Sequence, residues 1–286
     1  MIEKSLLERL GFTDEDKKII LNAEKNNSSA IEKIAVDFWE KGASFPHCLK
    51  KVRKTDKILS PYTLDLLFIL HLTSFLKEEY IRRNISEEIY WDTVKDIKFK
   101  ADECRAVYDT VGTFVAEWFE GFFRLTRFSF GRLQFDALNA NEKIKAKTKT
   151  VEKGDFILSC HIPSGSRLSY DECISAYKKA YEFFSDQFEG ELAIICISWL
   201  LYPEYKKIFD NCSNTKRFIE DYQIYKVKAQ LTFEDAWRVF NTNDYSSVEA
   251  LCNKTSMQRG FIEHIKNKGK FGYAFGVLLF DGERVL

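Results

Sequence analysis

The chain has 286 residues and 43 basic against 43 acidic side chains, so its formal net charge is zero and no global field would recruit nucleic acid or an anionic membrane surface. Its length suits one large domain or two ordinary ones, and such domains bury enough surface to fold without stabilisation by disulfides or metal ions. Seven cysteines without a C-x-x-C pair predict reduced, mostly buried thiols and a cytoplasmic protein, and the charged start MIEKSLLERLG predicts no signal peptide.

The first half of the chain has the periodicity of helices. One apolar helical face ends shortly before Gly42, a residue type that stops helices: Ile31, Ile34, Ala35, Phe38 and Trp39. Ser60 and Pro61 predict the N-cap and first residue of a helix that is apolar nearly all round, and therefore central and buried. Asp65 and His71 inside that helix need hydrogen-bond partners.

Two further helices are predicted before residue 126. Ser86 has the position of an N-cap for the first. The second is predicted from an apolar stripe made of Val111, Phe114, Val115, Trp118, Phe122 and Phe123. The sequence therefore predicts a helical N-terminal domain over residues 1–126.

The pattern changes to alternation near Arg127. The run RFSFGRLQFDAL alternates with a slip at Gly131, which predicts a β-bulge. The run KIKAKTKT places its lysines on one face and predicts a half-exposed strand, and a third strand is expected over 156–162. We expect these three strands to form an antiparallel meander. The lysine stripe, Lys143 to Lys149, would attract a phosphorylated ligand or simply solubilise an exposed face.

A polar loop and a helix follow the third strand. Ser169 and Glu172 have the spacing of a capping box, which places a helix start at the end of a sheet strand. The apolar run LAIICISWLLY (192–202) predicts a strand covered on both faces, and it is too short to span a bilayer. Pro203 closes this strand.

The remaining elements are shorter. The runs YKVKA (225–229) and AWRVF (236–240) are each candidate strands. Thr255 and Gln258 form a second capping box, which opens a helix to about Lys266, and GYAFGVLLF (272–280) predicts the last strand.

This order of strands, loop, helix and strand is that of the acetyl-CoA-dependent acyltransferase (GNAT) fold. Several runs resemble a family of bacterial acyltransferases that pair a helical N-terminal domain with a GNAT-like C-terminal domain: GRLQFDAL (131–138), CHIPSGSRLS (160–169), ISWLLYP (197–203), SNTKRF (213–218) and TSMQRGFIEHI (255–265). The resemblance implies an α+β protein, with a GNAT-like mixed α/β domain over residues 127–286. It also implies acyl-CoA or acetyl-CoA as co-substrate, a small-molecule amine as acceptor, and pantetheine lying where the strands at 156–162 and 192–202 splay apart.

Where GNAT enzymes hold the CoA pyrophosphate, this chain has the loop Ser164, Gly165, Ser166, Arg167, Leu168 and Ser169. Backbone N–H groups at a helix start suit such an anion, with Arg167 as its charge partner. The loop has one glycine and does not match the family signature Q/R-x-x-G-x-G/A. The alternatives are an ordinary capped helix start and, for the whole protein, a non-catalytic GNAT-shaped ligand-binding or interaction module that has lost CoA binding.

His161 ends the strand beside this loop. The resemblance places it near the thioester, as a base or as a group that polarises a carbonyl, and the alternative is a structural histidine. Cys160 points to the opposite face and cannot pair with it. Tyr202 and Tyr205 lie where GNAT enzymes often place the tyrosine that protonates the leaving thiolate.

Other patterns are less specific. Arg132 and Gln134 would share a strand face and line a polar cleft, or lie on an exposed sheet face. No cluster of residues has the spacing of a zinc site, so no metal is expected. The leading prediction is an N-acyltransferase that moves an acyl group from acyl-CoA to a small amine.

Overall fold

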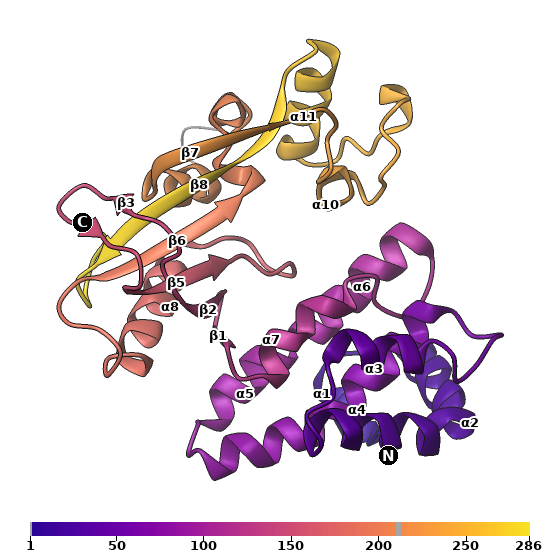
Figure 1. The fold of residues 1–286 in the computed structure, drawn as a ribbon. Helices are drawn as coiled ribbons and strands as arrows, with labels where there is room; N and C mark the ends of the chain where they lie inside the picture. The colour runs from indigo at the N-terminus through magenta and orange to yellow at the C-terminus, as the bar shows by residue number, and fades with distance from the viewer. Residues whose placement is uncertain (1, 210–212) are drawn as a thin grey trace. The chain divides into compact units, whose positions relative to one another are not determined.

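The computed structural model describes residues 2–209 and 213–286, and their contacts form two compact units (Figure 1). The first unit ends at Phe128 and the second starts at Ser129. The division falls inside one short strand, Arg127–Phe130 (β1). The first unit is helical and the second contains a mixed sheet, so the predicted α+β fold class is confirmed.

Helices and one 3-10 turn build the first unit. They are α1 (Lys4–Arg9), α2 (Asp14–Trp39), α3 (Phe45–Val52), α4 (Pro61–Arg82), α5 (Glu87–Val94), α6 (Asp96–Tyr108), the 3-10 turn η1 (Ala116–Phe119) and α7 (Glu120–Phe123). Two predicted N-caps are confirmed, since the Ser60 hydroxyl accepts the N–H of Tyr62 and the Ser86 hydroxyl accepts that of Ile89. Helix α4 is buried along most of its length, as its apolar sequence predicts.

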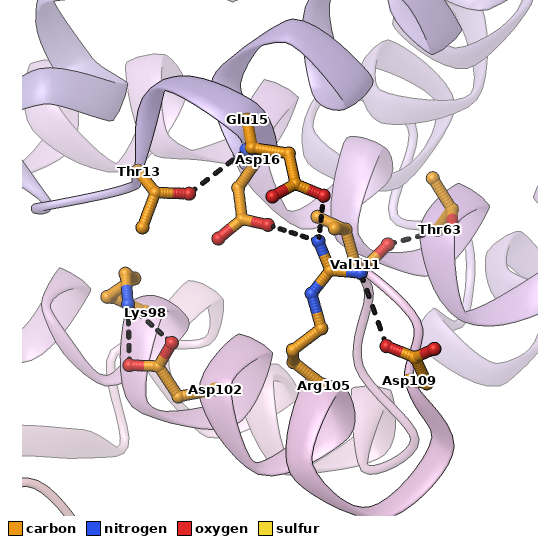
Figure 2. A network of polar contacts seen from close by, with 9 residues as sticks. All are labelled: Thr13, Glu15, Asp16, Thr63, Lys98, Asp102, Arg105, Asp109 and Val111. Carbon is orange, nitrogen blue, oxygen red and sulfur yellow. Dashed lines mark hydrogen bonds and ion pairs between the residues drawn. The ribbon is translucent and has the colours of Figure 1, made fainter.

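Helix α6 is tied to α2 by charged side chains (Figure 2). The Arg105 guanidinium lies 2.8 Å from the Asp16 carboxylate and 3.3 Å from that of Glu15. Thr13 caps α2 by accepting the N–H of Asp16, which places both carboxylates in the first turn, where the helix dipole favours them. Exposed ion pairs contribute at most about 1 kcal/mol each, so this network orients α6 more than it stabilises it.

The helix predicted over 111–123 is confirmed only in part, because residues 116–123 are helical as η1 and α7 whereas residues 111–115 are not. The chain is irregular before η1 because residues 111–113 pass close to the start of α4. The Thr113 N–H donates to the Tyr62 carbonyl at 3.0 Å, and the Thr63 hydroxyl donates to the Val111 carbonyl at 2.8 Å. A Cβ on Gly112 would lie 2.4 Å from the Tyr62 carbonyl carbon. This close approach overrides the helical period of the apolar residues.

A six-stranded sheet forms the centre of the second unit, in the order β1-β2-β5-β6-β8-β7. Its strands after β1 are β2 (Leu133–Asn139), β5 (Phe156–His161), β6 (Leu192–Ser198), β7 (Gln223–Gln230) and β8 (Phe271–Phe280). The other elements of this unit are β3 (Ile144–Lys145), β4 (Thr150–Val151), α8 (Tyr170–Phe183), α9 (Asn214–Glu220), α10 (Ala236–Phe240), α11 (Ser256–Lys266) and the 3-10 turns η2 (Trp199–Leu201), η3 (Pro203–Lys207) and η4 (Val248–Ala250).

Two details of the predicted meander need correction. Gly131 has a φ of +68° and lies between β1 and β2, which are separate neighbouring strands, so it marks a turn rather than a bulge within one strand. The run 143–150 does not join the main sheet, because β3 and β4 pair with each other. Instead Ile144, Ala146 and Val151 pack against sheet residues such as Ile157 and Ile195. The meander therefore consists of β1, β2 and β5.

The predictions for the carboxyl-terminal elements agree more closely with the structure. The run YKVKA lies inside β7, GYAFGVLLF lies inside β8, and the Thr255–Gln258 capping box of α11 is confirmed in both directions. The run AWRVF is helix α10, so its strand prediction is wrong. The strand predicted over 192–202 ends at Ser198 and continues as η2.

The sheet of the second unit has two differently covered faces. Helix α8 packs on one face, where the Tyr177 ring lies 6.1 Å from that of Phe135 and 5.8 Å from that of Phe280. The β3–β4 ribbon covers part of the other face near the start of β5. On that second face, Ile157 is the residue of β5 that packs in the apolar cluster with β3 and β4. Ser159 and His161, further along the strand, are not part of this cluster.

The six cysteines among the described residues are unpaired, and five of them are buried; Cys212 lies outside the described residues. No helix within residues 2–209 and 213–286 has both the length and the apolar character that a membrane crossing requires.

Candidate active site

The two central strands, β5 and β6, run parallel and then part. Their ladder joins Leu158 to Ile194, Ser159 to Ile195 and Cys160 to Cys196, and it ends there. Beyond that point His161 pairs with Gln134 on β2, while Ile197 and Ser198 pair with β8. Each strand therefore stays with its outer neighbour as the central pair separates. Ile197, a large apolar side chain just past the parting, is 46% exposed.

His161 lies at this parting and contacts a carboxylate. Its Nε2 is 2.9 Å from Oδ2 of Asp136, and both side chains are mostly buried. The contact follows from register: Asp136 lies opposite Ser159 and Gln134 opposite His161, so all four side chains share one face of the sheet. Gln134 is buried, and its Nε2 has no hydrogen-bond partner among the described residues.

Cys160 lies on the opposite face, as predicted from the alternation of strand side chains. Burial raises the pKa of its thiol well above the usual range, so the reactive thiolate is disfavoured. It lies close to the hydroxyl pair formed by Tyr177 and Tyr222, whose oxygens are 3.1 Å apart. Cys160 is therefore part of the core beneath α8.

Arg132 holds the loop after β5 through hydrogen bonds to its backbone. This buried guanidinium donates to the backbone carbonyls of Pro163 at 2.8 Å, Ser166 at 3.1 Å and Arg167 at 3.1 Å. Burial lowers the pKa of Arg132 from its usual value, but an arginine keeps its charge at neutral pH. Three carbonyls of the loop are thus turned toward one cation, and Gly165 has a φ of +108°, which suits glycine. The sequence alternation predicted that Arg132 would line a polar cleft or lie on an exposed sheet face, whereas in the structure it is buried and holds the loop.

The helix start beyond this loop differs from the sequence prediction. Ser169 is the N-cap of α8, but its side chain makes no capping bond, so the predicted Ser169–Glu172 capping box is absent. The first bond of the helix runs from the Cys173 N–H to the Ser169 carbonyl. The N–H groups of Tyr170, Asp171 and Glu172 precede it and are not accepted by Ser169.

Charges of both signs surround this helix start. Asp171 and Glu172 lie in the first turn and would oppose a bound anion. Arg167 is exposed in the loop, and Arg217 of α9 stacks over the Tyr170 ring at 3.4 Å from its centroid. Arg217 is not among the site residues predicted from the sequence, because its proximity to α8 depends on the packing of α9. Arg217 lies in the run SNTKRF (213–218), one of the runs that resemble the acyltransferase family, and this was the sequence signal that could have identified it.

The two candidate tyrosines follow the end of β6 and are both buried. The Tyr205 hydroxyl accepts the backbone N–H of Gly272 at 3.3 Å, and its ring lies 4.9 Å from that of Phe261. The Tyr202 ring lies 5.0 Å from the Tyr205 ring. Burial raises the pKa of both hydroxyls, so each stays protonated at neutral pH. No protein partner of the Tyr202 hydroxyl is found among the described residues.

The structure thus brings some predicted site residues together. His161 and the loop 164–169 are continuous in the chain, and Arg132, Asp136 and Arg217 join them from other elements. Tyr202 and Tyr205 follow the end of β6, the other strand of the parting pair. No group of histidine, cysteine, aspartate or glutamate side chains in the described part of the chain could hold a metal ion.

This is the arrangement of an α/β domain that opens its sheet between two parallel strands, and comparison with known families agrees. The family model for a GNAT-like C-terminal domain matches residues 127–278, and that for an N-acyltransferase N-terminal domain matches residues 1–125. The chain belongs to this family of acyltransferases, as its sequence runs predict.

Solved structures share the fold over most of the chain. One is an acyltransferase mutant in complex with octanoyl-CoA, and another an acyltransferase in complex with decanoyl-CoA and teicoplanin; each is 17% identical, with a TM-score of 0.74 over 96% of this chain and 86% of that one. A further acyltransferase structure, with decanoyl-CoA, is 20% identical, with a TM-score of 0.73 over the same shares. No protein among the curated sequences matches this chain.

Proposed function

We propose that this protein transfers an acyl group from acyl-CoA to the amine of a small molecule. The observation that carries the proposal is the parting of β5 and β6 beside His161, next to a helix start whose first N–H groups have no side-chain cap. Family membership supports the reaction class. The solved relatives in complex with acyl-CoA support the choice of donor.

In this proposal the pyrophosphate of the donor lies against the loop 164–169 and the first turn of α8. Ser164, Gly165, Ser166, Arg167, Leu168 and Ser169 supply backbone N–H groups and one guanidinium. Such groups bind phosphate without the family's glycine signature, provided that the loop is held in shape, and Arg132 holds it. Arg167 and Arg217 offset the carboxylates of Asp171 and Glu172.

Pantetheine would then enter between the separating strands, with the thioester near the end of β5. Backbone N–H groups near His161 polarise the thioester carbonyl. The amine nitrogen bonds to the carbonyl carbon and gives up a proton to His161, and the carbon–sulfur bond breaks. Tyr202 or Tyr205, which remain protonated because they are buried, donate a proton to the leaving thiolate. The products are an amide and free CoA.

Ligand-induced stabilisation tests the donor half of this proposal. CoA, acetyl-CoA, octanoyl-CoA and decanoyl-CoA are added separately while thermal unfolding is followed. A ligand at a hundredfold excess over its Kd stabilises the native state by about 2.7 kcal/mol, which raises Tm by at least a few degrees for a protein of this size. Arg167→Glu should reduce the shift. Lys266→Glu, the same charge change at an exposed position on α11, should leave it unchanged.

The outcome also decides between this proposal and a non-catalytic module. Both variants are first shown to melt like the wild type without ligand. If no CoA compound shifts Tm or gives calorimetric heat, the acyltransferase proposal fails, and the fold serves as a ligand-binding or interaction scaffold. If CoA compounds bind, release of free thiol from acyl-CoA in the presence of a panel of small amines tests the transfer and the acceptor class.

A further inference from the structure

The second face of the sheet is covered only in part. On β6, Ile195 is buried in the apolar cluster with β3 and β4 and is 7% exposed, whereas Ile197, two residues further on the same face, is 46% exposed. On β8, Val277 is buried in the same cluster, whereas Phe275 is half-buried. Ile197 lies opposite Phe275 in the register, so the two uncovered side chains are direct cross-strand neighbours.

A second aromatic ring and two lysines extend this uncovered area. Tyr273 is half-buried on the same face of β8, and its ring centroid lies 5.6 Å from that of Phe275. On β7, Lys226 lies opposite Phe275 and Lys228 lies opposite Tyr273. We call these five residues, Ile197, Tyr273, Phe275, Lys226 and Lys228, the open patch. Contiguous apolar surface with polar groups at its rim is typical of a binding site.

The two lysine side chains lie over the rings of the open patch. The Lys226 ammonium is 5.2 Å from the Phe275 centroid, and that of Lys228 is 5.8 Å from Phe275 and 5.9 Å from Tyr273. A lysine that only solubilises an edge strand extends into water instead. Lys226 pairs with Glu142 at 3.2 Å, whereas Lys228 has no carboxylate partner among the described residues. The open patch therefore carries one positive charge that no side chain of this part of the chain neutralises.

The open patch begins where the central strands part. The ladder between β5 and β6 ends at Cys160 and Cys196, so the next residues, His161 and Ile197, lie on the two sides of the parting and on the second face. Neighbouring strands are about 4.8 Å apart, so β8 lies one strand from β6 and β7 lies two strands, about 10 Å, away. A ligand that reaches from the parting toward Lys228 would cross the Phe275 ring.

We propose that the open patch binds the acceptor, and that this acceptor is an amine separated from an anionic group by a flat apolar segment such as an aromatic ring. This inference rests on the proposed function and deepens it, because it gives the class of acceptor. The amine lies at the parting, beside the thioester. The ring packs on Ile197 and Phe275, and the anionic group binds the Lys228 ammonium about 5–10 Å from the amine.

Three acceptors that differ by one feature each test this class. 4-(Aminomethyl)benzoate has the amine, the ring and the carboxylate, benzylamine lacks the carboxylate, and 6-aminohexanoate lacks the ring. Thiol release from acyl-CoA is measured against the concentration of each. We expect kcat/KM for 4-(aminomethyl)benzoate to exceed that for benzylamine about tenfold and that for 6-aminohexanoate about fivefold. The phosphonate analogue of 4-(aminomethyl)benzoate shows which anion is preferred, and a preference for either anion over benzylamine supports the proposal.

Lys228 variants test the source of the anion preference. Lys228→Gln should lower kcat/KM for 4-(aminomethyl)benzoate about tenfold and leave that for benzylamine and the KM for acyl-CoA unchanged. Lys228→Arg keeps the charge and should restore most of the loss. Lys178→Gln is the matched control, because Lys178 is exposed on α8, which packs on the opposite face of the sheet. An equal fall for both acceptors, or no fall for either, would overturn the proposal.

Phe275→Leu tests the ring contact and the other occupant that the open patch would fit, a second copy of the chain. It should lower kcat/KM about fivefold for the two acceptors that carry a ring and leave that for 6-aminohexanoate unchanged. Sedimentation of the wild type and of this variant measures self-association. A dimer that dissociates in Phe275→Leu would assign the open patch to an interface between copies and overturn the proposal.

Failure of this inference is distinguishable from failure of the proposed function. A protein that shows a CoA-induced Tm shift but acylates benzylamine as well as 4-(aminomethyl)benzoate, or acylates none of the three acceptors, would overturn the acceptor class alone. Absence of any Tm shift with CoA compounds would instead count against the proposed function.

Discussion

Asp65 illustrates how one buried charge depends on one partner. It lies on α4 with no exposed surface, and Arg53 donates to its two carboxylate oxygens over 2.7–3.1 Å. Burial raises the pKa of Asp65 to about 6, while Arg53 acts in the opposite direction. The carboxylate is therefore ionised at neutral pH and would be uncompensated without Arg53.

We predict that Arg53→Met lowers the free energy of unfolding at neutral pH by about 3–5 kcal/mol, because it leaves a buried carboxylate unpaired. Arg83→Met is the control: Arg83 pairs with Glu79 at the surface, and its loss should cost at most about 1 kcal/mol. Urea unfolding of both variants and the wild type measures the two costs. Equal costs would mean that Asp65 is satisfied in another way.

The same variant should have a distinctive pH dependence. A carboxyl group with a raised folded pKa stabilises the fold fully below its unfolded value of 3.8, and this contribution is lost as pH rises through about 6. Removing Arg53 raises the folded pKa further, so the deficit of Arg53→Met relative to wild type should shrink as pH falls from 8 to 5. Burial lowers the pKa of His71 to about 4, which acts in the opposite direction, but it is common to both proteins and cancels in the difference. A deficit independent of pH would contradict this account.

Substitutions of Tyr202 and Tyr205 should have different effects, because the two hydroxyls have different contacts. Tyr205→Phe leaves the buried N–H of Gly272 without its acceptor, and we predict a loss of about 1–3 kcal/mol of stability with little change in kcat. Tyr202→Phe removes a hydroxyl that has no protein partner in the described residues, and should lower kcat by about a hundredfold with little change in Tm. Thermal unfolding and thiol release measure both. The reverse pattern would assign the proton donor to Tyr205.

At the scale of elements, the loop between β5 and α8 depends on a side chain from another strand. Arg132→Met removes the donors for three carbonyls and should destabilise the protein by about 2 kcal/mol or more. It should also weaken the CoA-induced Tm shift and expose the loop to proteolysis. Arg132→Lys keeps the charge but not the planar fork, so we predict an intermediate effect. Full recovery by lysine would show that charge alone holds the loop.

The elements also show what sequence patterns can define. Helix starts were predictable where local chemistry decides them, as at Ser60 and at the Thr255–Gln258 capping box. The Ser169–Glu172 motif has the same spacing but makes no capping bond, so the motif alone does not fix the contact. Residues 111–115 and the paired strands β3 and β4 were predicted wrongly because distant residues decide their conformation. The five residues of AWRVF are too few for their period to separate strand from helix.

In the candidate site, too, some residues could be predicted from local sequence and others depend on distant parts of the chain. His161 and the loop 164–169 were found because they end a recognisable strand and precede a recognisable helix. The contacts of Asp136 and Arg132 depend on the register of β2 against β5 and on the path of the loop, which no local pattern specifies. Arg217 depends on how α9 packs against α8. The predicted roles of His161, Tyr202 and Tyr205 stay predictions until the variants are measured.

At the scale of the whole molecule, the contacts divide the chain into two compact units, and each has its own buried core. The residues proposed to bind the donor all lie in the second: Arg132, His161, the loop 164–169 and Arg217. A cut before Arg127, at the predicted domain boundary, would keep β1 whole and its place beside β2 intact. We propose that residues 127–286 carry the complete acyl-CoA site.

The fragment 127–286 should therefore unfold cooperatively, and CoA should stabilise it by a free energy comparable to that for the full chain. Apolar surface exposed by the cut would lower the intrinsic Tm of the fragment, so the comparison uses the stabilisation free energy derived from each shift, which follows the ratio of ligand concentration to Kd. Arg167→Glu must reduce the shift in the fragment as it does in the full chain. A folded fragment that no longer responds to CoA, beside a full chain that does, would show that the helical unit contributes directly to the donor site. A fragment that binds CoA but cannot transfer to any amine accepted by the full chain would instead assign acceptor binding to the helical unit.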